Sequence, residues 1–264
     1  MTLSRLDLDG VGSPRLLAER IHEIEDLPLK VPLEELCAAL DIVAIEQTST
    51  QAFEALLVTD SLKSQGAITL NSDSPWHRRR FSLAHELGHF LIEAHRPREG
   101  LPIECSLGDL HLLNPRDKDR RRRIEAEANT FAAHLLMPPK RIREIVGREG
   151  VSLETLLKMA DGFAVSKEAM ARAFVDAHPE PVAIIVSRKG RTERFYRSED
   201  FPYLPLAKSK PLPQDCLSAD WSRPSECSEI EEIEPDVWLS EQEAQKVLCL
   251  TAVSYTHLRA HETI

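Results

Sequence analysis

The sequence predicts an α+β fold. Several segments repeat apolar residues at three- and four-residue steps, which indicates helices, while short apolar runs between residues 42 and 71 and after residue 180 indicate strands. The chain has 264 residues, 42% of them hydrophobic and 29% charged, as in ordinary globular proteins of one large or two modest domains. Its longest apolar runs, such as Val182 to Val186, are too short to cross a bilayer, so no membrane partner is expected.

The amino-terminal third is predicted to mix helices and strands. Ser13 and Pro14 supply an N-cap and a first helical residue before an apolar stripe that reaches Ile24. A second short helix is expected from Pro32 to Leu40. Strands are expected at residues 42–47, 53–59 and 67–71.

Two longer helices are predicted next. The first runs from Trp76 to Ile92, with apolar residues at helical steps and no proline. Residues 97–119 contain Pro, Gly, Asn and Asp and are expected to form a loop, although residues 110–113 could be anchored. The second helix runs from Arg121 to Met137 and ends at Pro138-Pro139.

The carboxyl-terminal half is predicted to be helical first and then β-containing. Residues 151–177 read as two short helices and residues 181–197 as a hairpin, whereas residues 201–240 read as loops with one or two strands. We therefore divide the chain into a core at 1–139, a helical segment at 140–178 and a small β-containing region at 179–252. Residues 253–264 resemble the translation of a sequencing-library adapter and are left out of the fold.

Charge and cysteine usage narrow the function classes. The net charge of -10 and the 5% aromatic content disfavour broad binding to nucleic acid, which needs surplus Lys and Arg. The first ten residues lack the features of a secretory signal, so a cytoplasmic location is expected. The five cysteines are scattered and show no CxxC spacing, which argues against a disulfide framework or a thiolate zinc site.

The segment His85-Glu86-Leu87-Gly88-His89 carries the clearest chemical signal. Two histidines four residues apart lie on one face of a helix and can bind one ion through their imidazole nitrogens, as in the HExxH zinc motif. The flanking residues are apolar at the right period, and Gly88 permits a close approach by another group. The sequence therefore predicts a Zn²⁺ site at His85 and His89.

A catalytic zinc needs a third protein ligand, for which the sequence offers several candidates. His95 is rejected: the β-branched Ile92 resists the left-handed turn needed to bring it back, and on a continuing helix it would lie about 15 Å along the axis from His85. Glu125 and Glu127 flank the apolar stripe of the second helix on opposite sides. We favour Glu125, because Asn129 follows it by one turn and could orient a histidine, and keep Glu127 as the alternative.

FSLAHELGHFLI followed by IEAEANTFAAHLLMP resembles the paired signature of the ImmA/IrrE family of zinc metallo-endopeptidases. The resemblance implies a zincin-like metallopeptidase core, in which the HExxH helix packs on a small sheet and on a second ligand-bearing helix. It also implies that His85, His89 and Glu125 bind zinc and that Glu86 is the catalytic acid/base. Members of the family typically cleave a helix-turn-helix transcriptional repressor during phage, mobile-element or stress induction, so such a repressor is the expected partner.

A different class of function stays open. Residues 156–175 have helix-turn-helix spacing, and arginine runs at 78–80 and 120–123 precede the two motifs, so the chain could be a DNA-binding or toxin-antitoxin regulator that uses the zincin fold as a binding module. The second helix of that segment offers only Lys167 and Arg172 against two acids, which is weakly basic for a reading helix. A purely structural zinc is disfavoured, since such sites recruit four ligands and often cysteines.

Overall fold

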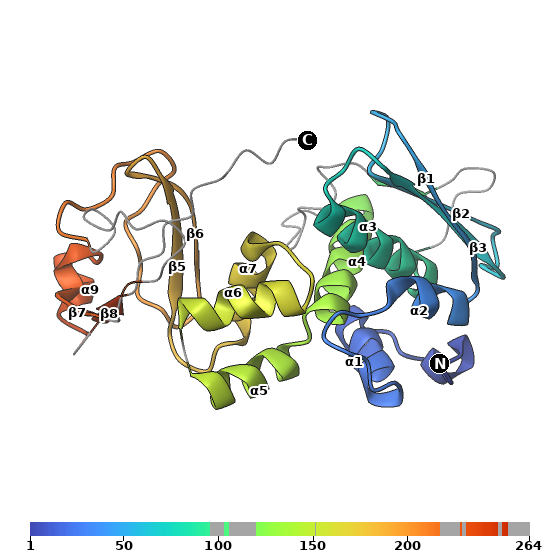
Figure 1. Ribbon diagram of the computed structural model, residues 1–264, viewed down its shortest axis with the longest axis horizontal. Coiled ribbons are helices and arrows are strands. Elements are labelled where there is room, and N and C mark those ends of the chain that lie inside the picture. Colours follow the sequence, from blue (N-terminus) through green and yellow to red (C-terminus); the bar gives the residue numbers. More distant parts are fainter. Residues whose placement is uncertain are drawn as a thin grey trace. The chain divides into compact units, whose positions relative to one another are not determined.

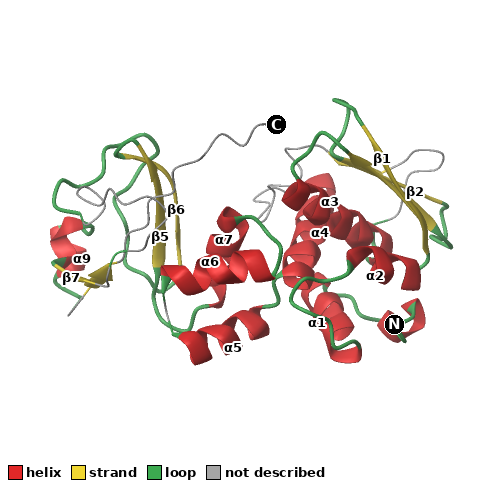
Figure 2. Cartoon of the chain, viewed as in Figure 1, coloured by secondary structure: helices red, strands yellow, loops and turns green. Residues whose placement is uncertain are grey.

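A computed structural model of the chain describes residues 1–95, 103–105, 120–150, 152–216, 228, 231–247 and 250–252. The chain forms two compact units (Figure 1). The first consists of residues 1–138 and 160–166, and the second of residues 139–159 together with the described residues from 167 onward. Helices and strands occur in both units, which confirms the predicted α+β class (Figure 2).

A four-stranded sheet forms one layer of the first unit. Its strands are β1 (Ile42–Thr48), β2 (Ala55–Thr59), β3 (Gly66–Asn71) and β4 (Ile103–Cys105), in the order β1-β3-β2-β4. β1 runs parallel to β3, whereas β2 runs antiparallel to both β3 and β4. Leu57 and Ile68 face each other across β2 and β3 and are fully buried, while their neighbour Val58 is exposed, so one face of the sheet carries the core.

The helices of the first unit are η1 (Arg5–Leu8), α1 (Pro14–Ile24), α2 (Leu33–Ala39), α3 (Trp76–Leu91) and α4 (Arg120–Leu136). α3 packs on β2 and β3 with one side and along α4 with the other, and α1 packs against α4 (Figure 1). Ser13 stands at the N-cap of α1 as predicted, although its side chain makes no capping hydrogen bond.

The middle of α3 is buried all round, from Ser82 to Phe90, because the sheet covers one side and α4 the other. α4 comes close at Gly88: a Cβ at that position would lie 2.8 Å from Cδ1 of Phe131, well inside the usual carbon contact of about 3.5–4.0 Å. The predicted close approach at Gly88 is therefore present, and its partner is the buried ring of Phe131. Without a side chain at this point, the two helices that carry the buried polar residues can pack directly.

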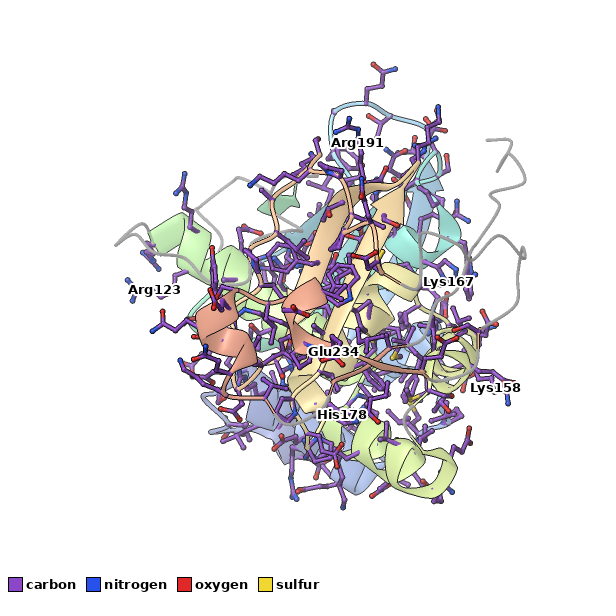
Figure 3. The ribbon with its side chains drawn as sticks, turned by 90° about the vertical axis from the view of Figure 1, so that its left-hand side faces the viewer. Arg123, Lys158, Lys167, His178, Arg191 and Glu234 are labelled. Carbon is purple, nitrogen blue, oxygen red and sulfur yellow. The ribbon has the colours of Figure 1, made fainter. Side chains whose placement is uncertain are left out.

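The second unit contains α5 (Pro139–Glu149), α7 (Lys167–Ala177) and a hairpin of β5 (Ala183–Arg188) and β6 (Arg191–Arg197). α7 packs against α5 and against the hairpin. Figure 3 labels Lys167, the first residue of α7, His178, which follows its last residue, and Arg191 at the start of β6. Glu168 of α7 accepts hydrogen bonds from Arg194 and Tyr196 of β6. The remaining elements are α6 (Leu153–Gly162), which crosses the division between the units, β7 (Glu231–Ile233), η3 (Pro235–Val237), α9 (Glu241–Ala244) and β8 (Leu250–Ala252).

The predicted helices and strands up to residue 92 and from 120 to 197 are confirmed to within about two residues at their ends. Several elements were not predicted, among them η1, η3 and α9. Residues 103–105 form β4 inside the expected loop, and Pro139 begins α5 instead of only ending α4, since proline is well tolerated in a first helical turn. Residues 110–113 and the adapter-like residues 253–264 lie outside the described part of the chain.

Among the described residues, no helix combines the length and the apolar composition that a bilayer crossing requires.

Candidate metal centre

α3 places His85 and His89 one turn apart on the same face. Both side chains are completely buried, and their Nε2 atoms lie 3.0 Å apart. The helix can hold polar groups at this depth because its other faces are packed by Leu83, Leu87 and Phe90, all of them buried. The spacing of four residues thus produces the paired imidazoles that the sequence predicts.

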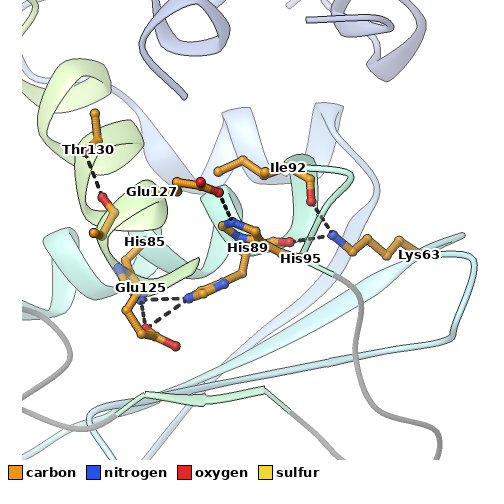
Figure 4. Close-up of polar contacts among 9 residues, drawn as sticks. Lys63, His85, His89, Ile92, His95, Glu125, Glu127 and Thr130 are labelled. Carbon is orange, nitrogen blue, oxygen red and sulfur yellow. Dashed lines mark hydrogen bonds and ion pairs between the residues drawn. The ribbon is translucent and has the colours of Figure 1, made fainter. Parts of the chain in front are cut away.

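α4 brings Glu125 to the two histidines. Its Oε2 lies 3.2 Å from Nε2 of His85 and 3.3 Å from Nε2 of His89, and the residue is only 4% exposed (Figure 4). These three residues form the one group of metal-ligand side chains found in the described part of the chain. Two motifs some forty residues apart in sequence therefore meet at a single point.

The protonation states suit metal binding. Burial lowers the pKa of His89 to about 4, against the opposing hydrogen bond with Glu125, so the ring is neutral at neutral pH. Burial would raise the pKa of Glu125, but the hydrogen bonds with His85 and His89 outweigh it and lower that pKa below 4.5. Metal ligands must be unprotonated imidazoles and carboxylates, and both groups are already in that form.

The three donor atoms have the spacing and the chemistry of a metal site. Two imidazole nitrogens and one carboxylate oxygen form a small triangle with edges of 3.0, 3.2 and 3.3 Å. Nitrogen and oxygen donors of this kind suit divalent transition metals, whereas Ca²⁺ and Mg²⁺ are held by oxygen ligands. His85, His89 and Glu125 are therefore able to hold such an ion together.

Glu127, the alternative third ligand, points elsewhere. Its Oε2 lies 2.9 Å from Nε2 of His95, its side chain is 34% exposed, and it does not belong to the triangle (Figure 4). His95 is also nearer than a continuing helix would put it, because α3 ends at Leu91 and Ile92 is extended. The His95 ring centroid lies 5.0 Å from that of His89, although Nε2 of His95 is hydrogen-bonded to Glu127 and does not belong to the triangle.

Glu86 and Asn129 lie close in sequence to residues of the triangle. Glu86 follows His85 on α3 and is completely buried. Asn129 is one turn after Glu125 on α4 and is buried as well. Both residues are therefore buried on the helices that carry the triangle, and the roles expected for them from the sequence stay predictions.

The first arginine run has structural contacts. Arg80 is 7% exposed, donates from Nη2 to the carbonyl of Val31 and lies over the Trp76 ring. Arg79 donates from Nη1 to the carbonyls of Ser72 and Ser74, just before α3 begins. Both guanidinium groups therefore fix the entry to α3.

Sequence reasoning also missed Lys63. This lysine is 7% exposed and donates from Nζ to the carbonyls of His89 and Ile92. It stands in a polar turn between two strands, where no periodic pattern distinguishes it from a solvated surface lysine.

Comparison with known proteins agrees with the two motifs. Residues 37–174 match the IrrE N-terminal-like domain, Peptidase_M78. The chain is 31% identical over 134 residues to the radiation response metalloprotease IrrE of Deinococcus radiodurans, covering 50% of this chain and 38% of that protein. It is 32% identical over 127 residues to the protein of the same name from Deinococcus deserti, covering 48% and 42% respectively. The aligned region thus spans about two fifths of these relatives.

Because the domain match covers more than half of the sequence, the chain belongs to the ImmA/IrrE family, with a zincin-like core of the Peptidase_M78 type.

Proposed function

We propose that this chain is a zinc-dependent endopeptidase of the ImmA/IrrE type that hydrolyses a peptide bond in a regulatory protein. The observation that carries the proposal is the buried triangle of His85, His89 and Glu125. Neighbouring ligand atoms in a tetrahedral zinc site lie about 3.3 Å apart when the ligand distances are about 2.0–2.1 Å. The observed edges of 3.0 to 3.3 Å match this size, and two histidines with one glutamate form a known catalytic zinc set.

Each ligand has a separate task in the proposed site. His85 and His89 supply nitrogen donors from one helix, and Glu125 supplies a negative oxygen donor from the neighbouring helix. Asn129 is proposed to help orient a ligand from the next turn of α4. A bound zinc ion would supply an activated water and polarise the scissile carbonyl.

Glu86 is proposed as the general acid/base. It accepts a proton from the attacking water as the oxygen bonds to the peptide carbonyl carbon, and it then delivers that proton to the leaving amine nitrogen as the carbon–nitrogen bond breaks. Its sequence position next to the ligand His85 keeps the carboxylate on the same turn of α3. Complete burial of Glu86 strengthens its interaction with a developing charge.

The proposed substrate is a helix-turn-helix transcriptional repressor, because the family resemblance implies such a partner. The DNA-binding alternative has less support, because these cations are used within the fold: Arg194 of β6 is paired with Glu168 of α7, and Arg79 and Arg80 donate to backbone carbonyls at the start of α3. The endopeptidase hypothesis explains why His85, His89 and Glu125 are buried together, whereas DNA binding does not.

The test compares four forms of the purified full chain for zinc content and for cleavage of candidate repressors. Wild type is expected to hold about one zinc per chain. Glu125→Gln is expected to lose the metal, whereas Glu127→Gln, the matched substitution two residues along the same helix, is expected to keep it. Glu86→Gln is expected to keep zinc and lose cleavage. Undiminished cleavage by Glu86→Gln, or a wild-type protein that binds no zinc after reconstitution, would refute the proposal.

A further inference from the structure

Lys63 reaches the end of the helix that carries both histidines. It lies in the turn between β2 and β3, yet its ammonium group is buried and donates at 2.7 Å to the carbonyl of His89 and at 2.7 Å to the carbonyl of Ile92 (Figure 4). One of the two acceptors is therefore the backbone of a proposed metal ligand. No sequence motif or family match assigns a role to this lysine.

The carbonyl of His89 lies in the last turn of α3. At the end of this helix the N–H of Ile92 donates to the carbonyl of Gly88, and the N–H of His95 donates to the carbonyl of Ile92. In general, the last carbonyls of a helix lie past its regular N–H donors, so that a side chain can serve them. A cation at this point supplies the donor and interacts favourably with the negative end of the helix dipole.

The turn around Lys63 is shaped to present the ammonium group. Lys63 has a φ of 53°, a left-handed conformation that is uncommon for a residue with a side chain. Oδ1 of Asp60 accepts hydrogen bonds from the N–H groups of Leu62 and Ser64, which holds the turn closed. Nη1 of Arg5 donates at 2.6 Å to the carbonyl of Lys63, and its guanidinium lies 4.9 Å from the ring centroid of Phe90 on α3.

We propose that Lys63 is a positioning residue for the metal centre: by fixing the backbone of His89 near the carboxyl-terminal end of α3, it holds this ligand at the distance that His85 and Glu125 require. The inference rests on the proposed function, since it presumes that these three residues bind a metal ion. Helix ends open more easily than helix centres, and His89 is only two residues from the end at Leu91. Loss of the ammonium group would therefore release the second histidine before the first.

The experiment measures metal affinity with Co²⁺ alone as the probe, by its visible absorption, and with Zn²⁺ in competition with a chelator. Lys63→Met keeps most of the apolar stem but removes the donor, and we expect about ten- to hundredfold weaker binding with a changed Co²⁺ spectrum. Lys63→Arg keeps a cation and is expected to recover most of the affinity. Lys30→Met is the matched control, because Lys30 lies over the Trp76 ring near the other end of α3 and is expected to bind as wild type.

Two further measurements distinguish a positioning role of Lys63 from a purely stabilising role. Leu36→Ala empties part of the core of the same unit and is expected to lower the unfolding free energy without changing the metal dissociation constant while the protein stays folded. Amide hydrogen exchange of the metal-free protein is expected to rise at residues 88–92 in Lys63→Met and not in Leu36→Ala. If Lys63→Met does not fold, Arg5→Met removes the support of the turn and is expected to weaken binding severalfold in the same direction.

Different results would refute the proposed metal centre and the proposed positioning role of Lys63. Wild-type protein that binds neither Co²⁺ nor Zn²⁺ would overturn the metal centre and, with it, the role of Lys63. Wild type that binds both ions, together with unchanged affinity in Lys63→Met or in the Arg5→Met substitute, would overturn the positioning role alone.

Discussion

Replacement of Gly88 by alanine tests how closely α3 and α4 must pack for the site to exist. The new Cβ would lie 2.8 Å from Cδ1, 3.3 Å from Cγ and 3.4 Å from Cβ of Phe131. The nearest of these contacts is short by about 0.7 Å or more relative to ordinary carbon contacts. Phe131 is fully buried, so its ring cannot swing into solvent to relieve the overlap.

Two opposing effects set the change in the free energy of unfolding that Gly88→Ala causes. Overpacking of a well-filled core costs about 1–3 kcal/mol, whereas replacing glycine by alanine inside a helix gains about 1 kcal/mol. We therefore expect Gly88→Ala to lower the free energy of unfolding by up to about 2 kcal/mol. Gly147→Ala is the matched control, because Gly147 is inside α5, exposed, and a Cβ there meets no atom within 4 Å. It should raise the free energy of unfolding by up to about 1 kcal/mol.

The assay is urea denaturation of each variant, followed by circular dichroism and tryptophan fluorescence. The difference between the two alanine substitutions cancels the gain in helix propensity and leaves the crowding against Phe131. In a Phe131→Val background, where the ring is gone, the cost of Gly88→Ala should disappear. Gly88→Ala that stabilises as much as Gly147→Ala would refute the argument that α4 approaches α3 through this glycine.

Two further predictions concern titration and reactivity. Because burial lowers the pKa of His89 and of His95 to about 4, the unfolded chain binds protons at these sites from pH 6.5 downward while the folded chain does not. The unfolding free energy of metal-free protein should therefore fall as the pH is lowered from about 6.5 to 4, and His95→Gln should flatten this fall; a profile that stays flat in wild type would contradict the burial argument. Burial, with a smaller contribution from Glu34, raises the pKa of Cys37 to about 12, so iodoacetamide should modify this thiol at neutral pH only after unfolding. Peptide mapping that finds Cys37 alkylated in folded protein at the rate of a free thiol would contradict it.

The helical part of the site could be predicted because helix geometry fixes directions. Residues four apart share a face in any α-helix, so His85 and His89 meet regardless of what surrounds them. The pairing of two such helices then follows from their apolar stripes, of which Ala128, Phe131 and Leu135 are fully buried as expected. Periodicity therefore predicted which segments carry the candidate metal ligands. The order of the strands was not predicted, and β4, which is only three residues long, lies inside an expected loop.

The choice between Glu125 and Glu127 could not be derived from spacing alone. The two glutamates flank the same stripe, so the answer depends on how α4 is rotated about its axis. In the structure Asn129, Ala132 and Leu136 are buried beside the stripe, on the flank that includes Glu125. Phe131 packing over Gly88 helps to fix that rotation, and such a contact requires the two helices to be docked.

Lys63 and His95 show why contacts from loops stay beyond sequence reasoning. Each side chain reaches its partner only because the chain leaves regular structure nearby: Lys63 through a left-handed turn closed by Asp60, and His95 because Ile92 is extended after the end of α3. A polar turn between two strands suggests solvent exposure for Lys63, and a continuous helix suggests a distant position for His95. Whether a charged side chain can cap a ligand-bearing helix depends on where that helix ends. The Lys63→Met variant tests whether this helix end contributes to metal binding as much as the motif itself does.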